Sequence, residues 1–362
     1  MTAGGQDVAG TFYSRLFTKH PKLRCMFPAA MTSQNERLFR ALMKIVALLD
    51  EPDRLARYLN QLGFDHRKYG VRPEHYAAVA DALLYTLRRH CAVWGGEEEA
   101  AWTAAYQIAA DAMIAGAAGH FTPVVWKGRV VSHKLPTPHI AVLTVRTDAP
   151  LPRTAGQYVT VLHPGRQGEW RSFSPANAPD GDMTDIEIHV AKVDNGSVST
   201  ALAWHTRPGD EIVIGPPLGT MTPAGIEGRD LVCVAGGTGI APLNAIITQV
   251  LKDDEAAGPS RNITLFYGAR TARGLYAMPA LRRLSDTYPW LEVRGVVSGE
   301  SRFDGSRGNV ADVALNRGRW ADRDAFIAGP LPMVTSAVRG FRNAGFPDGC
   351  IHFDPVEARH DL

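Results

Sequence analysis

A glycine-rich turn in the last third of the chain has the residue types needed to hold a phosphate. The apolar run 231–235 is followed at once by a turn and a helix start, whose candidate residues are Gly236, Gly237, Thr238, Gly239 and Pro242. Glycines let the backbone approach a ligand closely, and a helix N-terminus offers free N–H groups and a partial positive charge. The turn therefore predicts a site for a pyrophosphate or a nicotinamide ribose, although a ligand-free strand-to-helix turn has the same pattern.

Further short motifs surround this turn in a definite order along the chain. They are Gly156-Gln157-Tyr158, Arg171-Ser172-Phe173-Ser174, Gly196-Ser197-Val198-Ser199 and Ala328-Gly329-Pro330. Taken singly, Arg171 is as typical of a surface ion pair as of a phosphate site, and Phe173 of a protein core. As an ordered set, the motifs resemble the ferredoxin–NADP reductase superfamily over about residues 122–354. The resemblance implies a flavin-binding β-barrel, with FAD as the flavin, followed by a nicotinamide-binding domain.

The resemblance also implies a role for each motif residue. Arg171 becomes the partner of the flavin pyrophosphate, Phe173 lies against the flavin ring, and Ser174 lies beside the N5 edge of that ring. This chemistry needs a fixed cation, a flat ring and a small hydroxyl group. The other flavin positions carried over are Tyr158, which packs on the flavin, and Gly196, Val198 and Ser199, which serve its phosphates.

His66 is the candidate iron ligand in the N-terminal part of the chain. A histidine near a helix end is usually a capped or surface residue, and the same holds for His75 and His90. However, Tyr13, Phe27 and Gln34 come before His66 in the order Tyr-Phe-Gln-His. This order resembles the globin domain of flavohaemoglobins, in which a globin is fused to a reductase of the type described above. The resemblance covers about residues 8–121.

The globin resemblance implies a haem b cofactor with His66 as its iron ligand. Tyr13 and Gln34 then line the distal side, and their hydroxyl and amide groups can donate hydrogen bonds to dioxygen. Phe27 wedges the haem, and Tyr76 contacts its proximal side. A neutral imidazole is a good axial ligand when its second N–H has an acceptor. The implied activity is electron transfer from NAD(P)H through FAD to haem, with nitric oxide and dioxygen converted to nitrate.

The nicotinamide cofactor remains open between NADH and NADPH. Tyr267 and Arg270 lie after the second strand of the α/β part, where the reductase family reads the adenosine half of the cofactor. Arg270 and Arg273 are suited to a 2′-phosphate and so favour NADPH. Globin-fused relatives usually take NADH, although no Asp or Glu, the usual ribose partner of NADH, is evident in this sequence.

The chain departs from both families at several positions. Few residues precede Tyr13, so we expect the first globin helix to be largely missing. Where the proximal acidic residue of the family would fall, this chain has Ala117-Ala118-Gly119. The flavin motif has Phe173 in place of tyrosine, Ala328 stands in place of a cysteine, and Phe353-Asp354-Pro355-Val356 lacks a late aromatic. These departures keep an alternative open, a flavin reductase or dehydrogenase linked to NAD(P)H or to an organic acid such as lactate, with a divergent globin and little nitric oxide dioxygenase activity. A haem-based sensor of oxygen or nitric oxide is disfavoured, because we expect no signalling output domain after the reductase motifs.

Three regions with different patterns are expected to position these residues. Helical patterns fill residues 1–121, at 10–17, 34–49, 52–62, 75–91 and 97–118. Short strands separated by Pro and Gly turns are expected in residues 122–227, at 124–132, 139–146, 158–163, 185–193 and 211–214. In residues 228–362, strands are expected to alternate with helices. The strands are expected at 231–235, 262–267, 291–297, 310–316 and 325–328, and the helices at 242–251, 277–286 and 333–344. The sequence therefore predicts an all-α globin domain, an antiparallel β-barrel and a doubly wound α/β domain.

Composition excludes several classes of function. The 362 residues carry 39 Lys and Arg against 37 Asp and Glu, so the small net charge of +2 gives no reason to expect a nucleic-acid partner. No apolar run approaches the roughly 18 residues of a spanning helix, and the N-terminus lacks the pattern of a signal peptide. The four cysteines are scattered, which is typical of a reducing cytoplasm rather than of a disulfide framework. We therefore expect a cytoplasmic enzyme whose partners are the small molecules nitric oxide and dioxygen.

Overall fold

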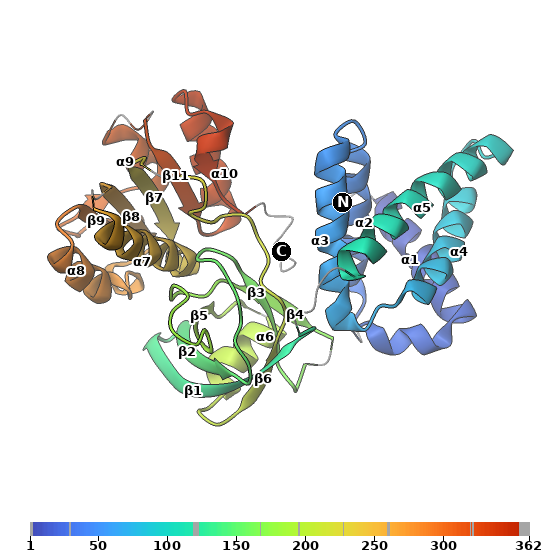
Figure 1. The fold of residues 1–362 in the computed structure, drawn as a ribbon, viewed down its shortest axis with the longest axis horizontal. Coiled ribbons are helices and arrows are strands. Elements are labelled where there is room, and N and C mark those ends of the chain that lie inside the picture. The colour runs from blue at the N-terminus through green and yellow to red at the C-terminus, as the bar shows by residue number, and fades with distance from the viewer. Residues whose placement is uncertain are drawn as a thin grey trace. The chain divides into compact units, whose positions relative to one another are not determined.

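The chain folds into two compact units (Figure 1). The computed structural model describes residues 3–28, 30–118, 123–166, 168–194, 196–226, 228–258, 261–318, 320 and 322–354. One unit is mainly helical and is formed by Met1–Val125 and Gln167–Glu169, and the other is formed by Trp126–Arg166 and Trp170–Leu362. The expected fold class, an all-α part followed by an antiparallel sheet and a parallel sheet, is confirmed. The domain bounds 1–121, 122–227 and 228–362 remain predictions.

Five helices make up most of the described part of the first unit. They are α1 (Ala3–Lys19), α2 (Thr32–Ala47), α3 (Pro52–His66), α4 (Pro73–His90) and α5 (Gly96–Ala118), with the short 3-10 helices η1 (Pro21–Met26) and η2 (Arg67–Tyr69) between them. Pro52 and Pro73 each begin a helix, where the missing N–H of proline costs nothing. Helix α1 begins seven residues before the predicted start at Gly10, and α3 extends four residues beyond its predicted end, so that its last residue is His66.

Helices α3 and α5 cross with their backbones in direct contact. A Cβ atom at Gly63 of α3 would lie 1.9 Å from the carbonyl oxygen of Met113, and one at Gly116 of α5 would lie 2.2 Å from that of Asn60. No side chain other than the hydrogen of glycine fits at either position. Because His66 lies three residues after Gly63, this contact determines where α3 presents its imidazole.

The substitution Gly63→Ala tests this contact. We expect it to destabilise the helical unit by about 1–3 kcal/mol, because the new methyl group must displace main-chain atoms of α5. Thermal unfolding of the full chain, followed by far-ultraviolet circular dichroism, measures the effect. Gly10→Ala in α1 is the control, since a Cβ atom there meets nothing within 4 Å. Equal melting temperatures for the two variants would contradict the inference.

The second unit begins with a closed antiparallel sheet. Its strands are β1 (Trp126–Thr137), β2 (Ile140–Thr147), β3 (Val159–Leu162), β4 (Trp170–Phe173), β5 (Asp185–Ala191) and β6 (Glu211–Ile214), in the order β4-β3-β6-β1-β2-β5. A bridge between Pro175 and Ile188 joins the segment after β4 to β5 and so links the two edges. The closed sheet is the predicted barrel, with the short helix α6 (Ser197–Thr200) and the π-helix η3 (Ala201–His205) between β5 and β6. Strand β4 was not predicted, so Arg171 lies within a strand rather than after one.

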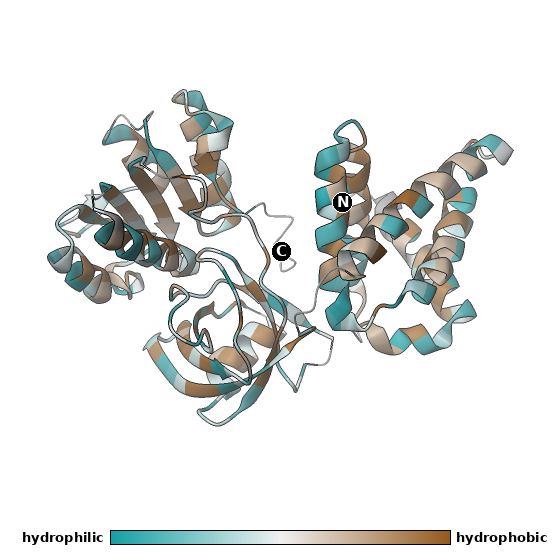
Figure 2. Ribbon diagram, viewed as in Figure 1, coloured by the Kyte–Doolittle hydropathy of each residue, from teal (hydrophilic) through white to brown (hydrophobic). Residues whose placement is uncertain are grey.

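A parallel sheet completes the second unit. Its strands are β7 (Leu231–Gly236), β8 (Ile263–Ala269), β9 (Leu291–Val297), β10 (Ser306–Arg307), β11 (Asp324–Ala328) and β12 (Ile351–His352), in the order β10-β9-β8-β7-β11-β12. Helices α7 (Ile240–Ala257) and α8 (Met278–Thr287) pack on one face, and α9 (Val310–Asn316) and α10 (Leu331–Asn343) pack on the other. Figure 2 shows the central strands as hydrophobic, as expected for a sheet covered on both faces.

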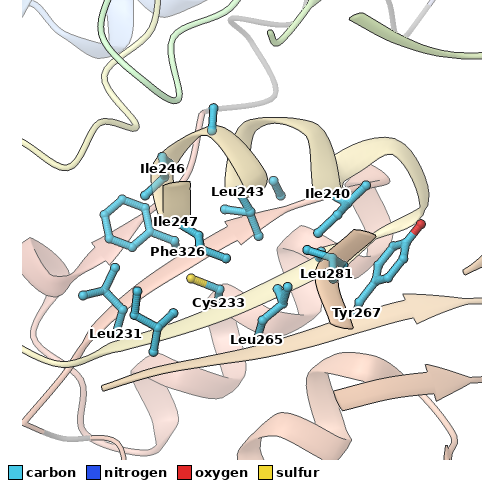
Figure 3. Close-up of a cluster of buried hydrophobic side chains, with 14 of the residues drawn as sticks. Leu231, Cys233, Ile240, Leu243, Ile246, Ile247, Leu265, Tyr267, Leu281 and Phe326 are labelled. Carbon is cyan, nitrogen blue, oxygen red and sulfur yellow. The ribbon is translucent and has the colours of Figure 1, made fainter. Parts of the chain in front are cut away.

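Figure 3 shows how α7 lies on the sheet: Leu243 and Ile247 pack over Cys233 of β7, while Ile240 lies beside Tyr267 of β8.

Some predicted elements of this sheet were wrong or missing. Residues 310–316 were expected as a strand but form helix α9, because the Asn309 side chain accepts a hydrogen bond from the Ala311 N–H at 2.9 Å and caps the helix. The two-residue strands β10 and β12 are too short to show an alternating pattern of hydrophobic and polar residues in the sequence. Among the described residues, no helix is long and apolar enough to cross a membrane.

Candidate functional site

His66 is oriented by the helix that it ends. Its Nδ1 atom lies 2.7 Å from the carbonyl oxygen of Leu62, one turn earlier in α3. Because a carbonyl can only accept, Nδ1 carries the proton, and Nε2 keeps the lone pair that a metal requires. Burial lowers the pKa of His66, and the neighbouring Asp65 opposes this shift. The imidazole is therefore neutral at physiological pH, which is the form that binds iron.

The two predicted distal residues, Tyr13 and Gln34, lie together with Phe27 in the structure. The Gln34 amide donates a hydrogen bond to the Tyr13 hydroxyl over 3.3 Å. The ring of Phe27 meets the ring of Tyr13 edge to face, with centroids 5.5 Å apart. Burial raises the pKa of Tyr13 to about 12, so its hydroxyl stays protonated and can donate. Residues from α1, α2 and the segment after η1 thus form one small polar site in an aromatic cluster.

Tyr76 contacts helix α5 through its main chain. Its backbone carbonyl accepts a hydrogen bond from the Tyr106 hydroxyl of α5 over 2.7 Å, and burial raises the pKa of Tyr76. Nothing in the sequence singled out Tyr106, because its partner is 30 residues away. Ala117 and Ala118 end α5 and carry no carboxylate, and Gly119 lies outside the described residues.

A buried ion pair flanks His66 and was not predicted. The Lys68 ammonium lies 2.6 Å from the Asp65 carboxylate, and the two side chains are 0% and 6% exposed. Their spacing of three residues is a usual signal for a helical pair, although it does not reveal burial. The carboxylate next to His66 is therefore engaged by a cation of its own chain.

The flavin-motif residues gather around the ends of β3 and β4. Val159 pairs with Phe173, which places Tyr158 close to Ser174 across the two strands. Tyr158 is buried, and a Cβ atom at Gly219 would lie 3.0 Å from its ring. Arg171 is half-buried on β4, and its Nη1 donates to the Trp170 carbonyl over 2.9 Å.

The second flavin motif forms a tight loop before α6. The Ser199 hydroxyl accepts a hydrogen bond from the Val193 N–H at 3.2 Å and donates to the Gly196 carbonyl at 3.4 Å. A Cβ atom at Gly196 would lie 2.5 Å from the Ser199 Oγ, so a larger residue would displace this hydroxyl. Val198 is buried, which leaves its backbone N–H rather than its side chain for a ligand. The predicted late segment at Pro355 and Val356 lies outside the described residues.

The glycine turn lies where the strand order of the parallel sheet reverses. Strand β7 is followed along the chain by β8 on one side, while β11 lies on its other side, and ligands bind at such a switch point in open α/β sheets. Gly237 has φ +54°, and a Cβ atom at Gly239 would lie 2.2 Å from the Ala328 carbonyl oxygen. Gly329 follows β11 and meets Gly236, since a Cβ atom on it would be 3.0 Å from the Gly236 Cα.

The remaining nicotinamide candidates differ in exposure. Thr238 is half-buried in the turn, and Pro242 is buried in the first turn of α7. Tyr267 is fully buried beside β7, and its hydroxyl donates to the Gly274 carbonyl over 3.3 Å. Arg270 and Pro330 are exposed, as residues that meet the outer part of a cofactor would be.

Comparison with known proteins matches each part of this arrangement. Residues 10–113 match the Globin family, residues 127–222 the Oxidoreductase FAD-binding domain, and residues 233–339 the Oxidoreductase NAD-binding domain. The Flavohemoprotein of Chromobacterium violaceum is 26% identical over 384 residues, which cover 97% of this chain and 93% of that protein. The chain belongs to the flavohaemoglobin family.

A solved flavohaemoglobin has the same fold. The crystal structure of flavohemoglobin from Malassezia yamatoensis, which holds FAD and heme, superposes with a TM-score of 0.81 at 18% identity and covers 97% of this chain and 94% of that one. The reductase part alone is 30% identical over 207 residues to the reductase component of phenol 2-monooxygenase from a Pseudomonas strain, and covers 57% of that protein. The flavohaemoglobin likeness therefore covers 97% of this chain, whereas the likeness to the phenol 2-monooxygenase reductase covers 56% of it.

The substitution Lys68→Met tests the buried ion pair beside His66. We expect it to destabilise the helical unit by about 3–5 kcal/mol, because it leaves the Asp65 carboxylate buried without its cation. Replacing both residues, as Asp65→Leu with Lys68→Met, is expected to restore most of the loss. Chemical denaturation followed by far-ultraviolet circular dichroism measures both effects.

Arg54→Met provides a matched control for this test. Glu51 and Arg54 have the same spacing and a distance of 2.6 Å, but their side chains are 46% and 62% exposed. We expect no measurable change in stability, because water already solvates both charges. A loss as large as that of Lys68→Met would show that burial of the Asp65–Lys68 pair is not the cause.

Proposed function

We propose that this protein passes electrons from NADH or NADPH through FAD to a haem b bound by His66, and converts nitric oxide and dioxygen to nitrate. The observation that carries the proposal is the hydrogen bond between Gln34 and Tyr13 in a buried aromatic cluster, on a chain that also has a reductase fold. In balance, two nitric oxide and two dioxygen molecules with one NAD(P)H yield two nitrate ions, one NAD(P)⁺ and one proton.

The helical unit fits a haem through the state of its histidine. Leu62 accepts the Nδ1 proton of His66, so this carbonyl sets the tautomer and the ring orientation that an axial ligand needs. When bound, a haem supplies an iron that exchanges single electrons and reacts with dioxygen. We propose that Phe27 packs against the porphyrin and that Tyr76 supports the proximal side.

The Tyr13 hydroxyl is the proposed polar contact on the distal side. It accepts its hydrogen bond from Gln34, so its own hydrogen remains available to a substrate oxygen that carries negative charge. A raised pKa keeps this proton in place over the physiological range. The aromatic rings of Phe12, Phe17 and Phe27 around it exclude water, which strengthens such a hydrogen bond.

The second unit supplies the proposed sites for FAD and the nicotinamide. We propose that Arg171 neutralises the flavin pyrophosphate, that Phe173 stacks on the ring, and that Ser174 contacts its N5 edge. FAD accepts two electrons as a hydride and releases them singly. The turn from Gly236 to Gly239 offers backbone N–H groups to the nicotinamide side, and the exposed Arg270 suits the adenosine side of either NADH or NADPH.

The proposed partners are therefore small molecules. We also propose a cytoplasmic location, supported by four cysteines that are all free.

Consumption of nitric oxide tests the proposal directly. With protein supplied with haem and FAD, and with NADH or NADPH, we expect Tyr13→Phe to lower the turnover of nitric oxide by about tenfold or more, because one oxyanion-type donor is lost. His66→Ala is expected to abolish the haem Soret band. Tyr85→Phe is the control, since Tyr85 lies at the surface under Arg15. Wild-type protein that takes up no haem would overturn the proposal.

The Asp65–Lys68 pair favours a second candidate function. Lys68 holds the Asp65 carboxylate and α5 ends in alanines, so among the described residues His66 is hydrogen-bonded to a backbone carbonyl and not to a carboxylate. A weakly donating ligand suits a flavin reductase or dehydrogenase, linked to NAD(P)H or to an organic acid such as lactate, whose globin has little dioxygenase activity. Nitric oxide turnover no faster than that of free flavin, together with flavin reduction by NADH or lactate, would select this alternative.

A further inference from the structure

A buried histidine joins the barrel to the parallel sheet. His189 on β5 is only 7% exposed, and its Nδ1 lies 2.8 Å from the hydroxyl of Tyr276, in the segment between β8 and α8. The two rings meet edge to face with centroids 5.5 Å apart. The contact links residues 87 positions apart, one from each half of the second unit.

A carboxylate contacts the second nitrogen of the His189 imidazole. His189 Nε2 lies 3.0 Å from Oε1 of Glu187, two residues earlier on the same strand. Ile186, Ile188 and Val190 alternate with these two residues and fill the barrel core, so Glu187 and His189 point out of the barrel together. A carboxylate only accepts, so Nε2 carries a proton toward Glu187, while Nδ1 lies at hydrogen-bond distance from the Tyr276 hydroxyl.

Glu187 is fixed by further hydrogen bonds of its backbone. Its N–H donates to Oδ1 of Asn177 over 2.9 Å, and its carbonyl accepts from the Ala176 N–H over 2.7 Å. The Ala176 carbonyl in turn accepts from the amide of Asn244 on α7 over 2.8 Å. Thus both ends of the Glu187–His189–Tyr276 chain reach the parallel-sheet part of the unit.

This chain lies beside the glycine turn. Strand β5 packs against the turn itself, and Tyr276 stacks edge to face on Tyr267, with centroids 6.3 Å apart. Tyr267 pairs with Ala235, the residue before Gly236. The hydrogen-bonded chain therefore runs from the outer face of the barrel to the strand end where the nicotinamide is proposed to bind.

We propose that His189 is a positioning residue for hydride transfer: through Tyr276 and Glu187 it holds the barrel at a set distance from the glycine turn. This inference rests on the proposed function, in which a C–H bond of the nicotinamide breaks and its hydrogen and electron pair pass to the flavin. The reacting atoms must come within about 3–3.5 Å, and a misplacement of 1 Å can cost about a hundredfold in rate. A buried hydrogen bond between the two cofactor-binding parts has the rigidity for this task.

Tyr276→Phe removes only the hydroxyl group that lies 2.8 Å from Nδ1 of His189. In stopped-flow experiments on the FAD-loaded full chain, we expect the rate constant for flavin reduction at saturating NADH to fall about tenfold, with the Kd for NADH changed by less than about twofold. Tyr288→Phe is the matched control, since its hydroxyl donates to Glu255 over 3.1 Å within the parallel-sheet part alone. We expect this control to react as the wild type does.

A second pair of variants separates positioning from simple packing. Glu187→Gln keeps an oxygen that accepts the Nε2 proton and is expected to retain the wild-type rate, whereas Glu187→Met is expected to lose rate in the same direction as Tyr276→Phe. In ¹⁵N spectra of histidine-labelled protein without nicotinamide, His189 is expected to show a fully protonated Nε2, which Glu187 holds in the wild type. Glu187→Met is expected to mix the two tautomers.

The outcomes distinguish this inference from the proposed function. If neither NADH nor NADPH reduces the wild-type flavin, the proposed function fails, whatever the spectra show. If the wild-type flavin is reduced but Tyr276→Phe and Glu187→Met match it, or if only the Kd changes, the positioning role is overturned. An equal loss in Tyr288→Phe would likewise overturn it, since that hydroxyl lies away from the contact between barrel and sheet.

Discussion

Contact between main chains, with no side chain between them, positions the candidate sites of both units. In the helical unit, Gly63 and Gly116 let α3 and α5 touch, and His66 follows on the same helix. In the second unit, Gly239 lies against Ala328, so the turn after β7 is pressed onto the end of β11. A methyl group at either place would collide with backbone atoms that cannot move separately from their element. Glycine at positions 63, 116 and 239 therefore determines where the His66 site and the glycine turn lie within their units.

Charge is arranged differently at the two sites. Around His66, the ionic groups that act on the imidazole are Asp65 and Lys68, which neutralise each other in a buried pair. At the contact between barrel and sheet, Glu187 is held by His189, whose hydrogen bond lowers the pKa of the carboxylate and keeps it ionised. The first arrangement leaves an uncharged ligand, and the second uses one charge to orient a hydrogen-bonded chain. The first arrangement follows from the cost of burying an ion without a partner.

The order of the elements was predictable because their patterns are local. Alternating burial along β5 and apolar runs such as Leu231–Gly236 are visible in the sequence, and proline marks the starts of α3 and α4. The errors arose where a local pattern was too short or was overridden. Strand β4 has four residues and depends on pairing with β3, and the apolar run of α9 was mistaken for a strand although Asn309 caps it as a helix.

The sequence by itself determined the fold class and the residue types available for chemistry, because glycine turns, periodicity and motif order act over a few neighbouring residues. It also singled out His66, Tyr13 and Gln34, yet not the carbonyl of Leu62 that orients the imidazole. Only the tertiary structure decided that Tyr13 meets Gln34, that Lys68 is buried with Asp65, and that His189 meets Tyr276. Such contacts depend on how whole elements pack, and packing is a property of the folded chain that no short stretch of residues specifies.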